Sequence, residues 1–242
     1  MIKFFRKIRQ KLLSENKFSK YLIYAFGEII LVVIGILIAL QINNWNENRK
    51  LNSLEIGMLK EINFSLETDL KDLINEEKNL KAKLNSGKII IGWIESNQGF
   101  NDSLSIPFIR MQHPIYFRYQ AAPYETLKQL GLNTIKNDSV KNQIAELYDV
   151  EYDDYRAELE IIRNTHITMR ELELEYFNEI SVHRPNMRPL DIVGLRKDNK
   201  LLALIKSLKN ADEYLLERRI PILKNKINQV KELIKEEIKS RS

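Results

Sequence analysis

Residues Tyr21 to Ile42 read YLIYAFGEIILVVIGILIALQI, an apolar run of 22 residues that follows a basic arm and precedes the polar string Asn43-Asn44-Trp45-Asn46-Glu47. At about 1.5 Å per residue the run spans roughly 33 Å as a helix, enough to cross a bilayer core of about 30 Å. The run therefore predicts a transmembrane helix and, with it, a protein attached to the lipid bilayer.

Glu28 is the one acidic or basic residue in this run, and a charge near the bilayer centre costs about 2.5 to 3.5 kcal/mol or more. We expect Tyr21 and Tyr24 to anchor the helix at one membrane interface and Trp45 at the other, since such aromatic side chains prefer the headgroup level. Tyr24 and Trp45 would then be about 32 Å apart, with Glu28 only about 6 Å inside the inner interface. At that depth the carboxyl group can snorkel or be protonated.

A cleaved signal peptide is the main alternative to a permanent anchor. Its apolar region is usually about 7 to 15 residues long and ends in small residues at the cleavage site. Here the run is longer, its exit reads Ala39-Leu40-Gln41-Ile42-Asn43, and no cysteine offers a lipoprotein site. The sequence favours an uncleaved signal anchor.

The charges on the two sides of the run predict its orientation. Before Glu28 the chain has one acid, Glu15, against seven basic residues, a balance of +6: Lys3, Arg6, Lys7, Arg9, Lys11, Lys17 and Lys20. After the run, basic and acidic residues balance as far as residue 65. We therefore expect the N-terminus in the cytoplasm and the remainder translocated.

The basic pI of about 9.1 results from the excess of Lys and Arg before the membrane run. Of the formal net charge of +5, residues 1 to 27 contribute +6 and Glu28 −1, which leaves residues 29 to 242 formally neutral. A nucleic-acid-binding domain needs a basic surface. We expect no nucleic-acid partner.

Three segments follow from these patterns. Residues 1–17 form a cytoplasmic basic amphipathic arm that either lies on an anionic leaflet or only enforces orientation during insertion. Residues 18–45 form the transmembrane helix, and residues 46–242 form a domain with its own core. The chain has no cysteine, so no disulfide stabilises that domain.

The hydrophobic period of residues 46–242 is helical almost throughout. Apolar residues from Leu59 to Leu84 recur every three or four positions, and Ser86-Gly87 predicts a stop. Residues 88 to 98 predict a shorter buried helix, with a strand as the weaker alternative. Because no proline separates the membrane run from this stalk, the two form one continuous helix in our prediction.

The rest of the domain is also predicted to be helical. Residues 99 to 122 are the least regular, and a short helix follows from Pro123 to Gly131. The longest helix is expected over about Asp138 to Ile180, with a seam that includes Tyr148, His166 and Met169.

Residues 181 to 198 are predicted as a loop and 199 to 210 as a short helix. The chain then ends in a helix that Pro221 kinks or restarts. The fold class is therefore all-α: an N-terminal transmembrane helix continuing into an extended antiparallel helical bundle.

The string from Gly27 to Glu47, GEIILVVIGILIALQINNWNE, together with the basic arm, resembles a family of uncharacterised single-pass membrane proteins of Gram-negative bacteria. The resemblance is close over residues 4 to 50 and looser around 124 to 132 and 136 to 139. It implies an inner-membrane protein with a periplasmic domain of high helical content. It implies no activity, cofactor or catalytic residue.

The sequence contains no motif that specifies a reaction. His113, His166 and His183 have no metal-ligand spacing, and we expect His166 to be a hydrogen-bonded core residue and the other two to be solvated. Nucleotide-binding glycine motifs, a nucleophile elbow and cysteine nucleophiles are absent. We expect no enzyme activity, no cofactor and no metal.

A set of tyrosines is open to two interpretations. They pack in the core, which we favour, or they line a ligand pocket: Tyr116, Tyr119, Tyr124, Tyr148, Tyr152 and Tyr155.

The membrane run offers one candidate contact face. At 100° per residue, six residues fall on one stripe: Glu28, Val32, Gly35, Ala39, Ile42 and Asn46. Gly35 and Ala39 form a small-xxx-small pair, which lets two membrane helices approach closely. We hypothesise that this stripe mediates homo-oligomer formation or contact with another inner-membrane or envelope protein. The alternative is that small residues are simply common in membrane helices.

Two classes of function remain. The first is a structural or interaction protein, a scaffold or accessory subunit anchored in the membrane. The second is a ligand-sensing module that signals through a membrane partner, since the short arm is too small for an output domain.

Overall fold

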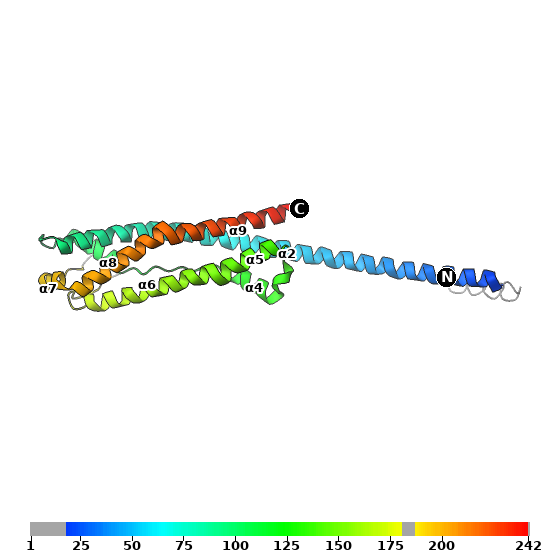
Figure 1. Ribbon diagram of the computed structural model, residues 1–242, viewed down its shortest axis with the longest axis horizontal. Helices are drawn as coiled ribbons and strands as arrows, with labels where there is room; N and C mark the ends of the chain where they lie inside the picture. The colour runs from blue at the N-terminus through cyan, green and yellow to red at the C-terminus, as the bar shows by residue number, and fades with distance from the viewer. Residues whose placement is uncertain (1–17, 181–186, 242) are drawn as a thin grey trace. The chain divides into compact units, whose positions relative to one another are not determined.

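The computed structural model describes residues 18–180 and 187–241 (Figure 1). The described residues form helices and no strand, with one isolated antiparallel bridge between Phe177 and Pro189. The all-α prediction is confirmed. By its contacts the chain divides into two units, Met1–Glu55 and Ile56–Ser242, so the boundary lies within the first helix.

The helices of the described chain differ greatly in length. Helix α2 is the longest and runs over 78 residues. The bounds are α2 Phe18–Glu95, α3 Ser105–Met111, α4 Ala122–Leu130, α5 Asp138–Glu146, α6 Tyr152–Glu173, α7 Ile192–Lys197, α8 Asn199–Tyr214 and α9 Ile220–Ser240. Short turns η1 (Asp102–Leu104) and η2 (Leu132–Thr134) are 3-10 helical, and η3 (Leu147–Glu151) and η4 (Leu215–Arg219) are π-helical.

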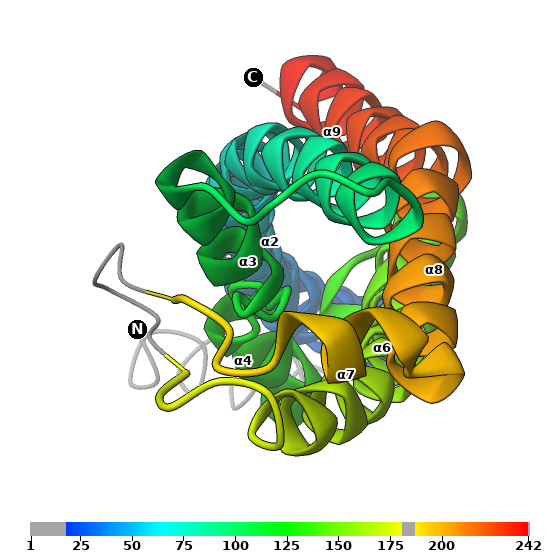
Figure 2. The same cartoon turned by 90° about the vertical axis from the view of Figure 1, so that its left-hand side faces the viewer.

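Within residues 56–242, three long helical segments lie side by side (Figures 1 and 2). Ion pairs show their directions: Glu67 of α2 meets Lys231 and Glu77 meets Lys224, so α9 runs antiparallel to α2. Lys226 of α9 meets Glu146 of α5, while Arg219 meets Glu158 of α6. The α8–α9 segment is therefore antiparallel to both α2 and α5–α6.

The α2 and α5–α6 segments run in the same direction because residues 112–121 carry the chain back along the bundle in an extended form. Burial alternates along this segment: Ile115 and Phe117 are buried, whereas Tyr116 and Arg118 are exposed. An extended chain presents successive side chains on opposite sides, so one side of the segment closes the core. The sequence predicted only that this region is irregular.

The core of residues 56–242 consists of two apolar clusters. One gathers around Leu59–Leu80 of α2 with α5, α6 and α9, and the other around Ile90–Ile94 with α3, α7 and α8. A helix whose apolar residues recur every three or four positions buries one stripe, and these stripes meet in the two clusters.

The predicted stop at Ser86-Gly87 is wrong. Ser86 is fully buried, and its hydroxyl donates to the Ala82 carbonyl at 2.9 Å, so it stays within the helix. A Cβ placed on Gly87 would lie 3.4 Å from Lys209 Cβ of α8. The small side chains of Ser86 and Gly87 permit close packing of α2 on α8. Residues 88 to 95 continue the helix rather than forming a separate helix or a strand.

Three further boundaries differ from the sequence prediction. The segment expected from Asp138 to Ile180 is helical only to Glu173, is interrupted by the π-helical turn η3, and is not the longest helix. The loop expected over 181 to 198 contains α7, which begins where the Asp191 side chain accepts from the Gly194 amide at 2.8 Å. Helix α8 extends to Tyr214.

Two predictions about local structure are confirmed. Helix α4 ends at Leu130, and Gly131 follows with φ of 94°. Helix α9 begins at Ile220 directly after the π-helical turn η4, and Pro221 lies in its first turn, where a kink or restart was predicted. Proline has no amide proton and fits the first turn of a helix, which explains why the irregular turn comes just before it.

Candidate functional site

Helix α2 contains the one candidate membrane span among the described residues. Its most apolar window has a mean hydropathy of 2.6, and none of that window is buried. A membrane anchor and a signal sequence both have this length and composition. The apolar run from Tyr21 to Ile42 therefore lies within the first unit.

The six residues of the predicted contact stripe all lie on α2. Val32, Gly35, Ala39 and Ile42 are exposed, and Glu28 and Asn46 are half-buried. A Cβ placed on Gly35 would meet no described atom within 4 Å outside its neighbouring turns. The stripe stays a prediction.

The predicted interface anchors are only partly described. Trp45 is exposed, with the Arg49 guanidinium carbon 5.3 Å from its ring centroid, and Tyr24 is also exposed. The Tyr21 side chain, the arm of residues 1–17 and His183 lie outside the described residues.

The second unit has a buried polar layer at the junction of its two apolar clusters. We use the term polar layer for Lys83, His166 and Asp212. On each long segment the polar residue lies between members of different clusters: Lys83 between Leu80 and Ile90, His166 between Leu159 and Met169, and Asp212 between Leu208 and Leu215. Three segments thus contribute one buried polar side chain each at the same level of the bundle.

The polar layer contains an ion pair and a neutral histidine. Lys83 Nζ lies 3.5 Å from Asp212 Oδ1, with 5% and 0% of the two side chains exposed. Burial raises the pKa of Asp212 to about 6, although the Lys83 charge opposes that shift. Burial, followed by the charge of Lys83, lowers the pKa of His166 to about 4. His166 is therefore uncharged at neutral pH.

His166 Nε2 lies 2.5 Å from the Met111 carbonyl oxygen. A carbonyl only accepts, so the proton of the neutral ring is on Nε2. The prediction that His166 is a hydrogen-bonded core residue is confirmed. Its bond fixes the end of α3 against α6, directly before the extended segment 112–121.

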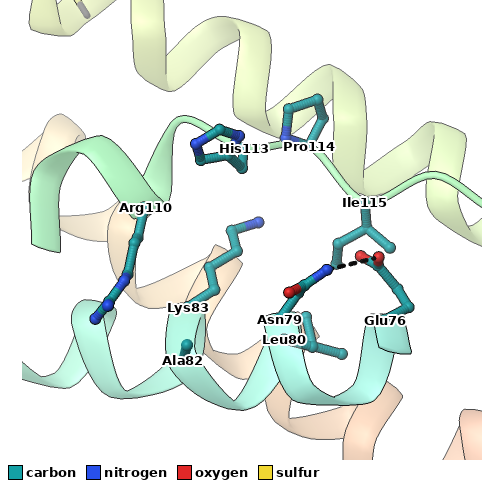
Figure 3. A pocket seen from close by; sticks show the side chains of 9 residues that line it. All are labelled: Glu76, Asn79, Leu80, Ala82, Lys83, Arg110, His113, Pro114 and Ile115. Carbon is teal, nitrogen blue, oxygen red and sulfur yellow. Dashed lines mark hydrogen bonds between the residues drawn. The ribbon is translucent and has the colours of Figure 1, made fainter. Parts of the chain in front are cut away.

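A pocket of about 380 Å³ opens beside the polar layer (Figure 3). It is lined by Glu76, Asn79, Leu80, Ala82, Lys83, Arg110, His113, Pro114 and Ile115. Figure 3 shows the Lys83 side chain extending from α2 towards the segment that carries His113 and Pro114. Arg110 lies at one end of the pocket, and Glu76 and Asn79 at the other.

Glu76 gives the pocket an acidic end. Its carboxylate accepts from Asn79 Nδ2 at 3.5 Å (Figure 3), and burial raises its pKa. Lys83, Arg110 and His113 place basic or polar groups elsewhere on the wall of the pocket. This combination can recognise a small molecule with an anionic group at one end and a hydrogen-bond donor at the other.

The tyrosine set belongs mainly to the core and does not line this pocket. Tyr124, Tyr148, Tyr152 and Tyr155 are buried, and the rings of Tyr124 and Tyr148 stack with centroids 4.5 Å apart. Tyr119 is half-buried against the ring of Tyr152, and Tyr116 is exposed. The core-packing interpretation is confirmed for the buried four, and two members of the set, Tyr116 and Tyr155, also line a separate pocket of about 240 Å³.

A buried carboxylate holds this tyrosine set to α2. The Tyr152 hydroxyl donates to Asp69 Oδ2 at 2.9 Å, and the Gln120 amide donates to Oδ1 at 2.8 Å. Burial raises the pKa of Asp69 to about 6, although these bonds oppose the shift. Asp69 thereby links α2, α6 and the extended segment.

A family model matches residues 28–180, more than half of the chain. The chain belongs to DUF6090, a family of unknown function. The matched region begins inside the apolar run and includes Lys83, Arg110, His113 and His166, while Asp212 lies beyond it. The expected membership of an uncharacterised family is confirmed. Neither the curated proteins nor the solved structures include a match.

Sequence reasoning missed the polar layer of this DUF6090 protein, with the exception of His166. A signal for Lys83 was present: it follows Leu80 by three residues, in step with the apolar stripe of α2, and a lysine in such a position is rarely buried without a partner. Asp212 lies 129 positions further along the chain, and no pattern in the sequence around it predicts its burial. His113 is exposed, as predicted, yet it lies at the pocket.

Proposed function

We propose that this DUF6090 protein is a membrane-anchored helical bundle with a structural or interaction role, a scaffold or accessory subunit, and that it is not an enzyme. The observation that carries the proposal is the apolar window of α2, none of which is buried, in a chain whose other unit has a well-packed core. An exposed apolar run of this length is stable in a bilayer but not in water.

The charge balance supports an orientation with the basic arm in the cytoplasm and residues 46–242 in the periplasm of a Gram-negative inner membrane. The described residues contain no cluster of three or more histidine or acidic side chains that would hold a metal. The rings of Tyr124, Tyr148 and Tyr152 pack against one another in the core. These features fit a protein that acts by contact with partners.

A labelling experiment tests the anchor and its orientation. The chain has no cysteine, so Ser14→Cys and Ser207→Cys each introduce a single thiol. In intact spheroplasts, a membrane-impermeant maleimide is expected to label Ser207→Cys, in α8, and to label Ser14→Cys only after the membrane is permeabilised. The reverse pattern, or a mature chain whose intact mass lacks the apolar run, would contradict the proposal.

The contact stripe is tested by matched glycine substitutions. We expect Gly35→Leu and Glu28→Leu to reduce cross-linked species and complex size in detergent, because they fill or alter the proposed face. Gly27→Leu makes the same change about 80° away from Gly35 around the helix and is expected to leave both unchanged. Equal behaviour of all three variants would rule out the stripe as a contact face. Purification from native membranes with mass spectrometry would then identify the partner.

The second candidate function is ligand sensing through a membrane partner. The observation that favours it is the pocket between α2 and residues 110–115, because a ligand there would contact two segments that converge on the polar layer. Binding that changes no partner interaction would argue against a sensing role.

A further inference from the structure

We propose that the pocket beside Lys83 binds a small organic anion through its carboxylate or phosphate oxygens, with Lys83 and Arg110 as the main contacts. This inference deepens the second candidate function, ligand sensing, by naming the class of ligand. It does not depend on the membrane anchor or on the stripe of α2.

The first support is the state of the Lys83 ammonium group. Its side chain is 5% exposed, yet Nζ donates no hydrogen bond to any described residue. Asp212 Oδ1, at 3.5 Å, is farther away than the 2.7 to 2.9 Å of a charge-assisted hydrogen bond. An ammonium has three donors and loses free energy when buried without partners. Lys83 therefore retains donors for an anion, and because the nitrogen itself is buried, the side chain must move towards the pocket to make that contact.

The second support is the direction of the Lys83 side chain and the composition of the wall opposite. Figure 3 shows Lys83 extending into the pocket, between the Arg110 end and the Glu76 end. Arg110 is exposed at the end of α3, and its planar guanidinium suits carboxylate or phosphate oxygens. His113 adds a further polar group from the extended segment. Figure 3 shows the Arg110 guanidinium on the α2 side of the pocket and the Lys83 ammonium directed towards His113 and Pro114, so an anion must extend across the pocket to contact both positive charges.

The acidic end and the size restrict the ligand further. At about 380 Å³ the pocket is near the lower limit for small-molecule sites, so it suits metabolite-sized anions. Glu76 would repel a second anionic group placed against it and would accept a hydrogen bond from a hydroxyl or amine. Leu80, Pro114 and Ile115 provide apolar contact along the middle. A hydroxy acid matches this arrangement better than the same acid without its hydroxyl.

Isothermal titration calorimetry on the full chain in detergent tests the proposal, with inorganic phosphate, butyrate and 3-hydroxybutyrate as probes and glycerol as the uncharged control. We expect binding of at least one anion, no binding of glycerol, and tighter binding of 3-hydroxybutyrate than of butyrate. If no anion binds more tightly than about 1 mM, the proposal is overturned.

Variants assign the binding to this pocket. Arg110→Gln changes an exposed side chain and is expected to weaken anion binding about tenfold, in line with the loss of one charge-assisted contact. Lys83→Met is combined with Asp212→Asn so that no uncompensated charge remains buried, and binding is expected to fall at least about tenfold. Lys81→Met removes an exposed charge from the same helix and should have no effect.

The outcomes separate this proposal from the function proposed above. Circular dichroism establishes that each variant retains its helical content before binding is measured. Wild-type affinity in both Arg110→Gln and the double variant would show that the anion binds elsewhere and would overturn the assignment. Failure of the maleimide labelling test would remove the membrane anchor and leave the pocket assignment intact.

Discussion

Replacing Glu173 with glutamine should make the protein more stable at mildly alkaline pH and flatten the dependence of its stability on pH. Glu173 is the last residue of α6 and is fully buried, with its Oε2 accepting from Gln112 Nε2 at 2.6 Å. Burial raises its pKa to about 8, although Gln112 and Arg170 oppose the shift. The folded protein therefore holds this carboxyl group protonated at neutral pH.

Two unpaired atoms agree with a protonated Glu173. Glu173 Oε1 and Gln112 Oε1 each have no hydrogen-bond partner among the described residues. A protonated carboxyl group is a donor as well as an acceptor. A proton on Glu173 Oε1 would supply the donor that Gln112 Oε1 lacks, and the two side chains would then form a reciprocal pair.

The sign and size of the effect follow from the two pKa values. The unfolded chain releases the Glu173 proton near pH 4.5 and the folded chain near pH 8, so between these values the folded state binds more protons and its stability falls as pH rises. At 1.36 kcal/mol per pH unit, the loss is about 2 kcal/mol between about pH 6.5 and pH 8. Glutamine cannot ionise and avoids this loss.

The assay compares urea unfolding of the wild type and Glu173→Gln in detergent across this pH range. Other titrating groups are common to both proteins and cancel in the difference. The variant should gain about 2 kcal/mol relative to the wild type from pH 6.5 to pH 8, equivalent to roughly 4 to 8 °C in Tm for a chain of this size. The exposed Glu171→Gln is the control and should follow the wild type. Parallel stability curves for wild type and Glu173→Gln would refute the buried, protonated state.

Two further predictions concern the stability of the second unit and use the same unfolding assay. Tyr152→Phe should destabilise the protein by about 1 to 3 kcal/mol because the buried Asp69 loses a hydrogen bond. The control is the exposed Tyr116→Phe, which should change stability by less than about 0.5 kcal/mol. Equal effects of the two variants would show that the hydrogen bond to Asp69 contributes nothing to stability. Gly131→Ala should lower the free energy of unfolding by about 1 kcal/mol because φ is 94° there. Gly57→Ala, inside α2 with open space around it, should raise the free energy of unfolding by up to about 1 kcal/mol. A stabilising Gly131→Ala would contradict the positive φ.

Local sequence signals predicted the elements that depend on a single segment. The apolar run from Tyr21 to Ile42, with no proline after it, predicted one helix that continues into the next segment. The period around His166 predicted a buried seam, and Pro221 predicted a kink or restart. Each depends on side-chain spacing or backbone chemistry within one helix. These predictions needed no knowledge of which helix packs against which.

Features whose outcome depends on packing against another helix were either misread from the sequence or gave no recognisable pattern. Ser86-Gly87 resembles a helix stop, but the pair lies where α2 approaches Lys209 of α8, and packing outweighs the local preference. Glycine and serine cost only about 1 kcal/mol or less in a helix interior, an amount that the burial of neighbouring apolar side chains offsets. Asp198 and Asn137, by contrast, cap α8 and α5 as local rules expect.

The sequence by itself determined that the chain is helical, that its apolar run is long enough to span a bilayer, and that its net positive charge lies before that run. These are properties of composition and period, which do not change with the partners of a helix. Only the tertiary structure decided that Lys83 meets Asp212 and that both lie beside a pocket formed with Arg110. Buried charges are tolerated where another segment compensates them, and the identity of that segment is set by the folding of the whole bundle.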